Sequence, residues 1–207
     1  CVNSNNLLQQ SDVYQEMFNE EVIPPMVIVS FSGGPVSYYH GTWETFVTKE
    51  LPQWAAEEYG VSIKSEHTLL TGISMGGYGS LKIGLKNPER FKAIAPMEPA
   101  IMPILEFPEE PHKRNSWWSP QQILEDVWGK PFNPEDFMKD NPANIVISNA
   151  KRIRDSGLDI YLEVGDEDFI QLHDGAEFLH RVFWDNDIRH EYHLVRWADH
   201  VGLSMHN

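Results

Sequence analysis

The stretch Thr68-Leu-Leu-Thr-Gly-Ile-Ser-Met-Gly-Gly77 decides the fold prediction. It contains Gly72-x-Ser74-x-Gly76, the pattern of a serine held on a sharp turn between a strand and a helix. Side chains two residues before and after the serine would clash at such a turn, so glycines are expected there. The pattern alone is a weak signal because it also arises by chance, and a glycine-rich turn without chemistry is the alternative. The apolar strand directly before Ser74 and the helical segment after it favour the chemical interpretation.

Outward from this turn, strand-like and helix-like segments alternate, which predicts an α/β fold with a mostly parallel sheet flanked by helices. The expected strands are residues 26–31, 67–73, 91–97, 158–164 and 190–195. The expected helices are residues 7–22, 42–59, 76–86, 144–156 and 174–185, with a kink or break at Pro52. Residues 98–145 lose the alternation and are rich in Pro and Trp, so they are expected to form an insertion or lid with short helices near 120–128 and 134–139. We expect residues 1–207 to form a single domain.

Composition excludes several classes of protein. The formal net charge is −15, from 16 Lys and Arg against 31 Asp and Glu, which argues against a nucleic-acid partner and against docking on an anionic membrane. No apolar run of about 18 residues occurs, so we expect no membrane insertion. The sequence does not decide whether the chain forms a homo-oligomer. It does not decide between a cytoplasmic and a secreted location either, because no signal segment is visible in this sequence.

Cysteine and histidine usage argues against a metal or cofactor. Cys1 is the only cysteine, so an intramolecular disulfide and a cysteine-based metal cluster are excluded. A leading cysteine is also the lipid-bearing residue of bacterial lipoproteins, although we favour the simpler interpretation that the sequence merely starts there. The nine histidines show no H-E-x-x-H or comparable spacing. We therefore expect neither a catalytic metal nor a cofactor.

A serine hydroxyl becomes a good nucleophile only when a neighbouring base removes its proton. In the order typical of this turn, an acid and then a histidine follow the serine. The loop at residues 165–169 carries Asp168, our preferred acid, and Asp166, the next candidate. His200 follows the last expected strand and is the preferred base. Glu98, after the strand that follows the serine's helix, is an alternative acid.

With these residues in place, the chain resembles the esterase D-like branch of the α/β-hydrolases, which includes feruloyl esterases, S-formylglutathione hydrolases, tributyrin-type esterases and antigen 85 mycolyltransferases. The resemblance runs from about residue 25 to residue 200 and is carried by residues 27–34, 43–52, 72–79, 87–91 and 165–169. It implies an α/β-hydrolase fold with Ser74 as nucleophile, Asp168 as acid and His200 as base. It also implies that the backbone N–H of Met75 is one donor of the oxyanion hole.

The resemblance has one departure. Family members begin with three more strands and a His-Gly-type loop that supplies the second oxyanion donor, whereas residues 7–22 look like the helix after that loop. Either the chain is N-terminally incomplete or the loop is rebuilt elsewhere, with residues 32–34 (Ser-Gly-Gly) as a candidate. Loss of one such donor lowers the rate about 10²–10³-fold.

These residues predict a serine carboxylesterase that hydrolyses an ester or thioester of a small acyl or aromatic acid through an acyl-enzyme. Trp117, Trp118 and Tyr78 are the expected substrate-binding residues, since pockets for small molecules are mostly apolar and aromatic. Two alternatives remain: acyl transfer to an alcohol, as in the mycolyltransferases, and a catalytically weak fragment that acts as a binding module.

Overall fold

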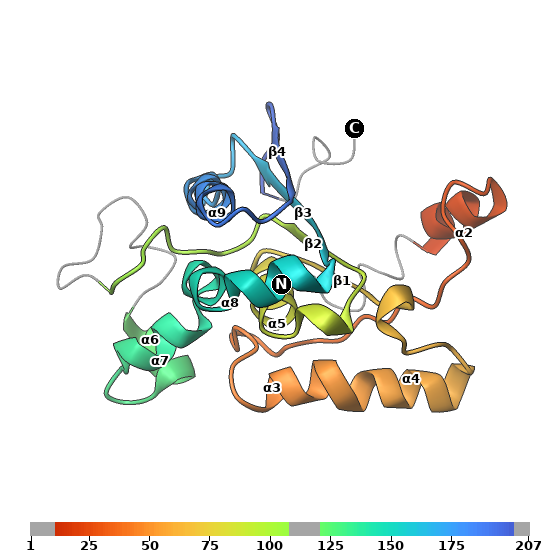
Figure 1. Cartoon of the computed structure of the whole chain (residues 1–207), viewed down its shortest axis with the longest axis horizontal. Helices are drawn as coiled ribbons and strands as arrows, with labels where there is room; N and C mark the ends of the chain where they lie inside the picture. Colours follow the sequence, from red (N-terminus) through yellow and green to blue (C-terminus); the bar gives the residue numbers. More distant parts are fainter. Residues whose placement is uncertain (1–10, 108–120, 201–207) are drawn as a thin grey trace.

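A computed structural model describes residues 11–107 and 121–200 of the chain (Figure 1). The four strands are β1 (Leu69–Ile73), β2 (Ala93–Met97), β3 (Asp159–Gly165) and β4 (Glu191–Val195). The α-helices are α2 (Ser11–Asn19), α3 (Thr42–Thr45), α4 (Leu51–Tyr59), α5 (Met75–Lys86), α6 (Gln121–Trp128), α7 (Pro134–Asp140), α8 (Pro142–Ser156) and α9 (His173–Asp185). The described part of the chain also contains a π-helix, η1 (Phe46–Glu50), and two 3₁₀ turns, η2 (Ser65–His67) and η3 (Pro88–Arg90).

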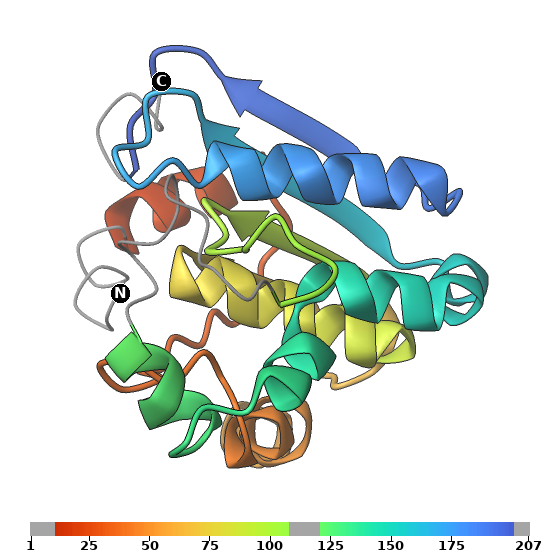
Figure 2. The same cartoon turned by 90° about the vertical axis from the view of Figure 1, so that its left-hand side faces the viewer.

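The strands form one sheet in the order β1-β2-β3-β4, and every neighbouring pair is parallel. This confirms the predicted parallel sheet. In register, Met97 lies opposite Ile73 on one side and opposite Glu163 on the other. Helix α5 packs on β1 and β2, α9 packs on β3, and α8 contacts both helices (Figures 1 and 2). All four strands therefore end at the same edge of the sheet, where the loops that carry the candidate site begin.

The prediction of a strand at residues 26–31 is wrong, because this segment has no regular structure. A β-branched run becomes a strand only when its backbone groups find a partner strand. The only strand neighbour of β1 in the described part of the chain is β2, and residues 26–31 join neither edge of the sheet. The run ends instead in an aromatic cluster, where Phe31 contacts Tyr39, Trp43 and Phe46.

The predicted helix at residues 42–59 is present, but it is divided into α3, η1 and α4. Pro52 lies in the first turn of α4, where its missing N–H costs no intrahelical hydrogen bond. We expected a kink or break at Pro52, but the irregular turn of this helix is the π-helix η1, which lies directly before α4. Helix α4 then ends at Gly60, which has φ +66° and donates its N–H to the carbonyl of Ala56.

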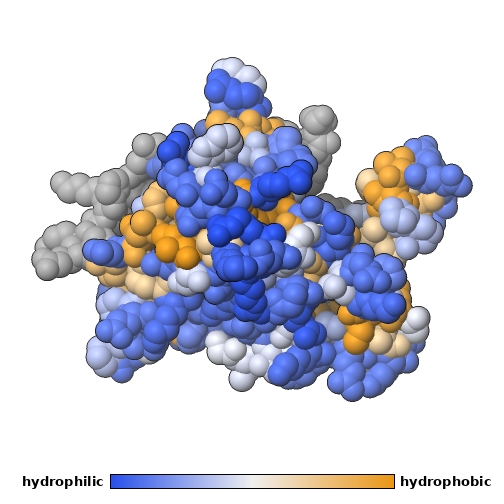
Figure 3. Space-filling view, viewed as in Figure 1, coloured by the Kyte–Doolittle hydropathy of each residue, from blue (hydrophilic) through white to orange (hydrophobic). Residues whose placement is uncertain are grey.

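The surface agrees with a mostly polar chain. The face shown in Figure 3 is largely hydrophilic, and its apolar residues form separate patches. Among the described helices, none has the length and apolar character needed to cross a bilayer. The short helices expected in the Pro/Trp-rich segment are present as α6 and α7.

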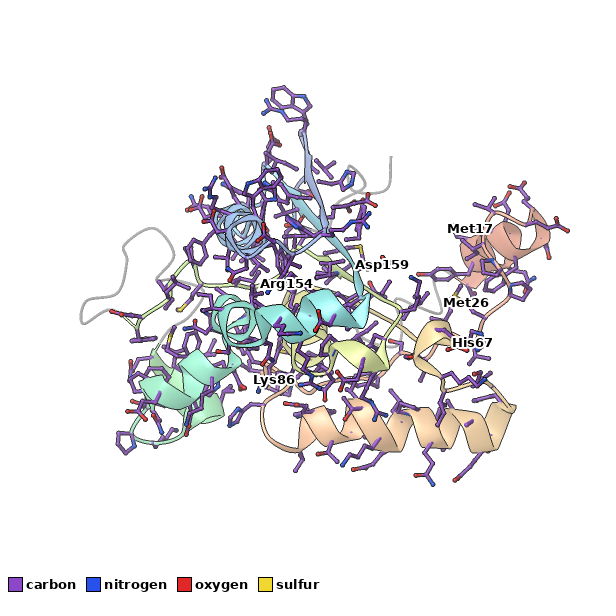
Figure 4. All side chains as sticks on the ribbon, in the orientation of Figure 1. Met17, Met26, His67, Lys86, Arg154 and Asp159 are labelled. Carbon is purple, nitrogen blue, oxygen red and sulfur yellow. The ribbon has the colours of Figure 1, made fainter. Side chains whose placement is uncertain are left out.

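A buried ion-pair network, which the sequence did not reveal, ties α7 to α5. The carboxylate of Asp140 accepts hydrogen bonds from Lys82 Nζ at 2.8 Å and from Lys86 Nζ at 2.7 Å. His40 Nδ1 and Trp128 Nε1 reach the same carboxylate at 2.6 Å and 3.2 Å. Burial opposes ionisation, but Lys82, Lys86 and His40 together hold the pKa of Asp140 well below its ordinary value. Lys86 is labelled on α5 in Figure 4.

We expect Asp140→Asn to lower the free energy of unfolding by about 3–5 kcal/mol, because it leaves the buried Lys82 ammonium without its counter-charge. Asp155→Asn is the control, since Asp155 pairs with Lys151 on the exposed side of α8 and its loss costs at most about 0.5 kcal/mol. Urea unfolding at neutral pH measures both. Because the pKa of Asp140 in the folded chain lies below its ordinary value of 3.8, this stabilisation is complete at neutral pH. It declines only as the pH falls below about 3.8. Equal losses in the two variants would contradict the assigned role.

Candidate active site

Ser74 lies on the sharp turn that the sequence predicts. It is the single residue between β1 and α5, and its backbone has φ +59° and ψ −118°. Such a conformation is rare for a residue with a side chain and is found mainly at functional sites. The turn is held by backbone bonds: Ser74 N–H donates to Met97 O at 3.0 Å, and Ser74 O accepts from Tyr78 N–H and Ala100 N–H. The end of β2 thus supports the strained turn.

The two glycines of the motif differ in how closely other atoms approach them. A Cβ on Gly72 would lie 2.5 Å from backbone atoms of Gly76, so the turn can close only on a glycine. A Cβ on Gly76 would meet nothing nearer than the Tyr39 hydroxyl at 3.8 Å. The expected clash is therefore confirmed at Gly72 and wrong at Gly76. A further close approach occurs at Gly77, where a Cβ would lie 2.6 Å from Met97 O.

We expect Gly72→Ala to destabilise the chain by about 3 kcal/mol, because the added methyl group meets backbone atoms that cannot move without opening the turn. Gly76→Ala is the matched control and should leave stability unchanged or raise it by up to about 1 kcal/mol, the helix-propensity gain of alanine over glycine. Chemical unfolding of both variants checks the contrast. If both variants unfolded at the same denaturant concentration, the close approach at Gly72 would not determine the turn.

The predicted acid and base contact each other. His200 Nδ1 and Asp168 Oδ2 are 3.0 Å apart, and the Asp168 side chain is fully buried. The Ile170 N–H donates to the other carboxylate oxygen at 2.6 Å. Burial opposes ionisation of Asp168, but the hydrogen bonds from His200 and from the Ile170 N–H lower its pKa. An ionised Asp168 at Nδ1 fixes the ring of His200 and leaves Nε2 for a second partner.

Asp166, the second acid candidate, holds the turn that leads to His200. Its Oδ1 accepts the Trp197 N–H at 2.6 Å, and its Oδ2 lies 3.1 Å from Arg196 Nε. The backbone N–H of Asp166 donates to Val195 O. These bonds join the loop after β3 to the loop after β4, so Asp166 is engaged in loop structure while Asp168 contacts the base.

Ser74, Asp168 and His200 all follow strands at the same edge of the sheet, after β1, β3 and β4. Within the residues that the structure describes, no hydrogen bond joins the Ser74 hydroxyl to His200. Hydrogen bonds between a nucleophile and its base are often long before substrate binds, so this geometry is compatible with a triad. The structure thus brings the acid and base together and puts the serine on their edge of the sheet.

Glu98 is a third acidic group at this site. It follows β2 and is fully buried. One of its carboxyl oxygens lies within 4.8 Å of a carboxylate oxygen of Asp168 and of a ring nitrogen of His200. Two carboxylates and an imidazole are a donor set that could also hold a divalent cation. The expectation of no metal stays a prediction.

The remaining residues expected at the site are those of the oxyanion hole and of the substrate-binding region. Met75 begins α5, so its N–H has no acceptor in a preceding helical turn and is available to an oxyanion. The Gly34 N–H of the candidate second donor loop bonds to Ser32 Oγ at 3.3 Å. Tyr78 is buried in the core, and its hydroxyl donates to the backbone carbonyl of Asp140; contact between Tyr78 and a substrate stays a prediction. The other two predicted substrate-binding residues, Trp117 and Trp118, lie outside the described residues.

Comparison with known proteins assigns the chain to a family. The Esterase family model matches residues 3–201. The chain is 38% identical to the S-formylglutathione hydrolase of Bos taurus over 61 residues, which are 30% of this chain and 21% of that protein. It is 27% identical to the acetyl esterase of Caldicellulosiruptor saccharolyticus over 125 residues, 60% of this chain and 46% of the relative. The matches thus span less than half of these relatives' lengths.

The fold has counterparts among solved structures. A solved ferulic acid esterase superposes with a TM-score of 0.65 at 16% sequence identity, covering 92% of this chain and 69% of that one. At this low identity, the superposition supports the fold alone. The shared fold confirms the α/β-hydrolase-like arrangement that the sequence predicts. Taken with the family match over almost the whole sequence, this chain belongs to the Esterase family of α/β-hydrolases.

Proposed function

We propose that this protein is a serine carboxylesterase that cleaves an ester or thioester of a small acyl or aromatic acid. The observation that carries the proposal is the buried Asp168–His200 pair at the same edge of the sheet as Ser74 on its strained turn. Family membership supports the reaction class. The choice among acetyl, feruloyl and thioester substrates rests on the relatives and is tested below.

The reaction proceeds in two acyl transfers. Ser74 Oγ attacks the carbonyl carbon of the ester while His200 accepts the hydroxyl proton, and Asp168 stabilises the imidazolium that forms. The carbonyl oxygen becomes an oxyanion that the Met75 N–H stabilises at the N-terminus of α5. The tetrahedral intermediate then expels the alcohol, which takes the proton from His200. This leaves the acyl group on Ser74.

Water completes the cycle. His200 removes a proton from a water molecule that attacks the acyl-enzyme, and the second tetrahedral intermediate releases the carboxylic acid and returns the proton to Ser74. An alcohol that replaces this water would give a new ester through the same triad. Hydrolysis and acyl transfer thus differ only in the acceptor.

A substrate panel tests the proposal. Acetyl and butyryl p-nitrophenyl esters, a feruloyl ester and an acyl thioester are offered to the purified chain, with and without glycerol as acceptor. We expect release of the free acid from at least one class, and an unchanged rate in Ser148→Ala, which removes an exposed hydroxyl on α8. A new glyceryl ester as the main product would favour the transferase alternative. No turnover above buffer on any class would contradict the proposal and favour a binding module.

A further inference from the structure

Glu98 is a buried carboxyl group that the proposed reaction does not use. Its side chain has 0% exposure, and its backbone is held at φ +44°, an uncommon conformation for a residue with a Cβ. Its N–H donates to Glu163 O, and its Oε1 accepts the Gly165 N–H at 2.6 Å. Glu98 therefore joins the loop after β2 to the end of β3, three residues before Asp168.

The second oxygen of Glu98 lacks a partner. Oε2 is buried and makes no hydrogen bond to any described residue. A carboxylate oxygen of Asp168 and a ring nitrogen of His200 both lie within 4.8 Å of a Glu98 oxygen. An unpaired oxygen is costly in the interior, and an unpaired negative charge more so. A proton on Oε2 would turn this acceptor into a donor beside the Asp168 carboxylate.

Only one of the two carboxyl groups can readily be ionised, since adjacent buried negative charges repel. Asp168 accepts hydrogen bonds from His200 and from the Ile170 N–H, which stabilise its charge, whereas Glu98 accepts only the Gly165 N–H. In the described part of the chain, no Lys or Arg forms an ion pair with either group. The neutral member is therefore Glu98.

We propose that Glu98 is a positioning residue whose protonated carboxyl group donates a hydrogen bond to Asp168 and so holds the Asp168 carboxylate against Nδ1 of His200. The inference rests on the proposed function and extends it by a fourth residue. Glu98 acts through Asp168 and His200 and does not itself touch the reacting atoms.

The local charges agree with a neutral Glu98. Burial, followed by the interaction with Asp168, raises the pKa of Glu98 to about 9, although the Gly165 N–H acts in the opposite direction. The other titratable groups that act on this site are Glu163 from β3, Tyr192 from β4 and His200. Glu163 also raises the pKa of Glu98.

The protonation state is tested without activity, in the Ser74→Ala background. With glutamate side chains labelled with ¹³C at the carboxyl carbon, we expect one signal to remain at the position of a neutral acid at pH 7, to titrate near pH 9 and to vanish in Glu98→Gln. Between about pH 4.5, the ordinary pKa of a glutamate, and about pH 9, the folded chain keeps the Glu98 proton and the unfolded chain loses it. The free energy of unfolding of the parent should therefore fall over this range relative to that of Glu98→Gln, which carries no such proton. A signal that titrates near 4.5, with a constant stability difference, would overturn the proposal.

The positioning role is tested in the active chain. We expect Glu98→Ala to lower kcat about 10- to 100-fold with little change in KM, by analogy with the loss of an outer hydrogen-bond partner of a metal-binding histidine. Glu98→Gln should recover much of that loss, because its amide N–H₂ also donates, and it should lack the fall in kcat near pH 9. Glu167→Gln removes one exposed charge from the same loop as Asp168 and is the control.

The outcomes separate the two proposals. Equal kcat values in Glu98→Ala and the parent chain, or an alkaline limb that persists in Glu98→Gln, would overturn the positioning role while esterase activity stands. An inactive parent chain would contradict the esterase proposal, and the ¹³C titration would still decide the protonation state of Glu98.

Discussion

Replacing Ser74 by alanine should abolish ester turnover, with kcat lower by about 10⁶-fold if the triad acts as a unit. The expected size follows from the covalent mechanism: no other described group lies on the strained turn between β1 and α5. Binding of the substrate should survive, because a single hydroxyl group contributes little of the contact that a bound ester makes. Initial rates with the best ester of the panel measure the loss, and a substrate-analogue titration measures the retained binding.

The control for this variant must separate loss of the nucleophile from loss of the fold. Circular dichroism and the urea midpoint should match the parent chain, since Ser74 holds the turn through its backbone N–H and carbonyl and not through its side chain. Turnover in Ser74→Ala within tenfold of the parent would exclude Ser74 as nucleophile. A change in both fold and activity would be resolved by Ser74→Cys, which keeps a nucleophilic atom at the same place.

Asp168→Asn should lower kcat by about 10⁴-fold, the second largest effect we expect. An asparagine side chain keeps the shape of the carboxylate but can present N–H₂ to His200 Nδ1, which favours the wrong tautomer of the base. It also removes the negative charge that stabilises the imidazolium. Steady-state kinetics should show the loss in kcat with KM little changed.

Asp166→Asn is the matched comparison, because Asp166 lies two residues away on the same loop and contacts Trp197 and Arg196 instead of His200. Its amide oxygen can still accept the Trp197 N–H, so kcat should fall by less than about tenfold. If Asp166→Asn were as damaging as Asp168→Asn, or if Asp168→Asn were nearly neutral, the acid would be misassigned.

Local patterns predicted those parts of the molecule that neighbouring residues determine. The turn at Ser74 and the division of residues 121–156 into helices follow from short-range patterns, and the alternation of strand-like and helix-like segments along the chain indicates the parallel sheet. The pairing of Asp168 with His200 was predicted from their order after successive strands, and the contact at 3.0 Å agrees with it.

The features that the sequence missed depend on long-range contacts. Residues 26–31 have the composition of a strand but no partner, and pairing is not a local property. Asp140 and Lys82 are separated by 58 positions, so nothing near either residue marks their ion pair. The sequence indicates Glu98 only as an alternative acid, because its burial next to Asp168 depends on how the ends of three strands come together in the fold.

The most direct measurement of the central claim is the site of covalent labelling by a fluorophosphonate probe, which reacts with a serine activated by its own base. We expect one adduct per chain, located by peptide mass mapping on Ser74, slowed by the best ester substrate and absent in His200→Ala. An adduct on another residue, or an active chain that takes up no probe, would contradict a reaction through Ser74 and His200.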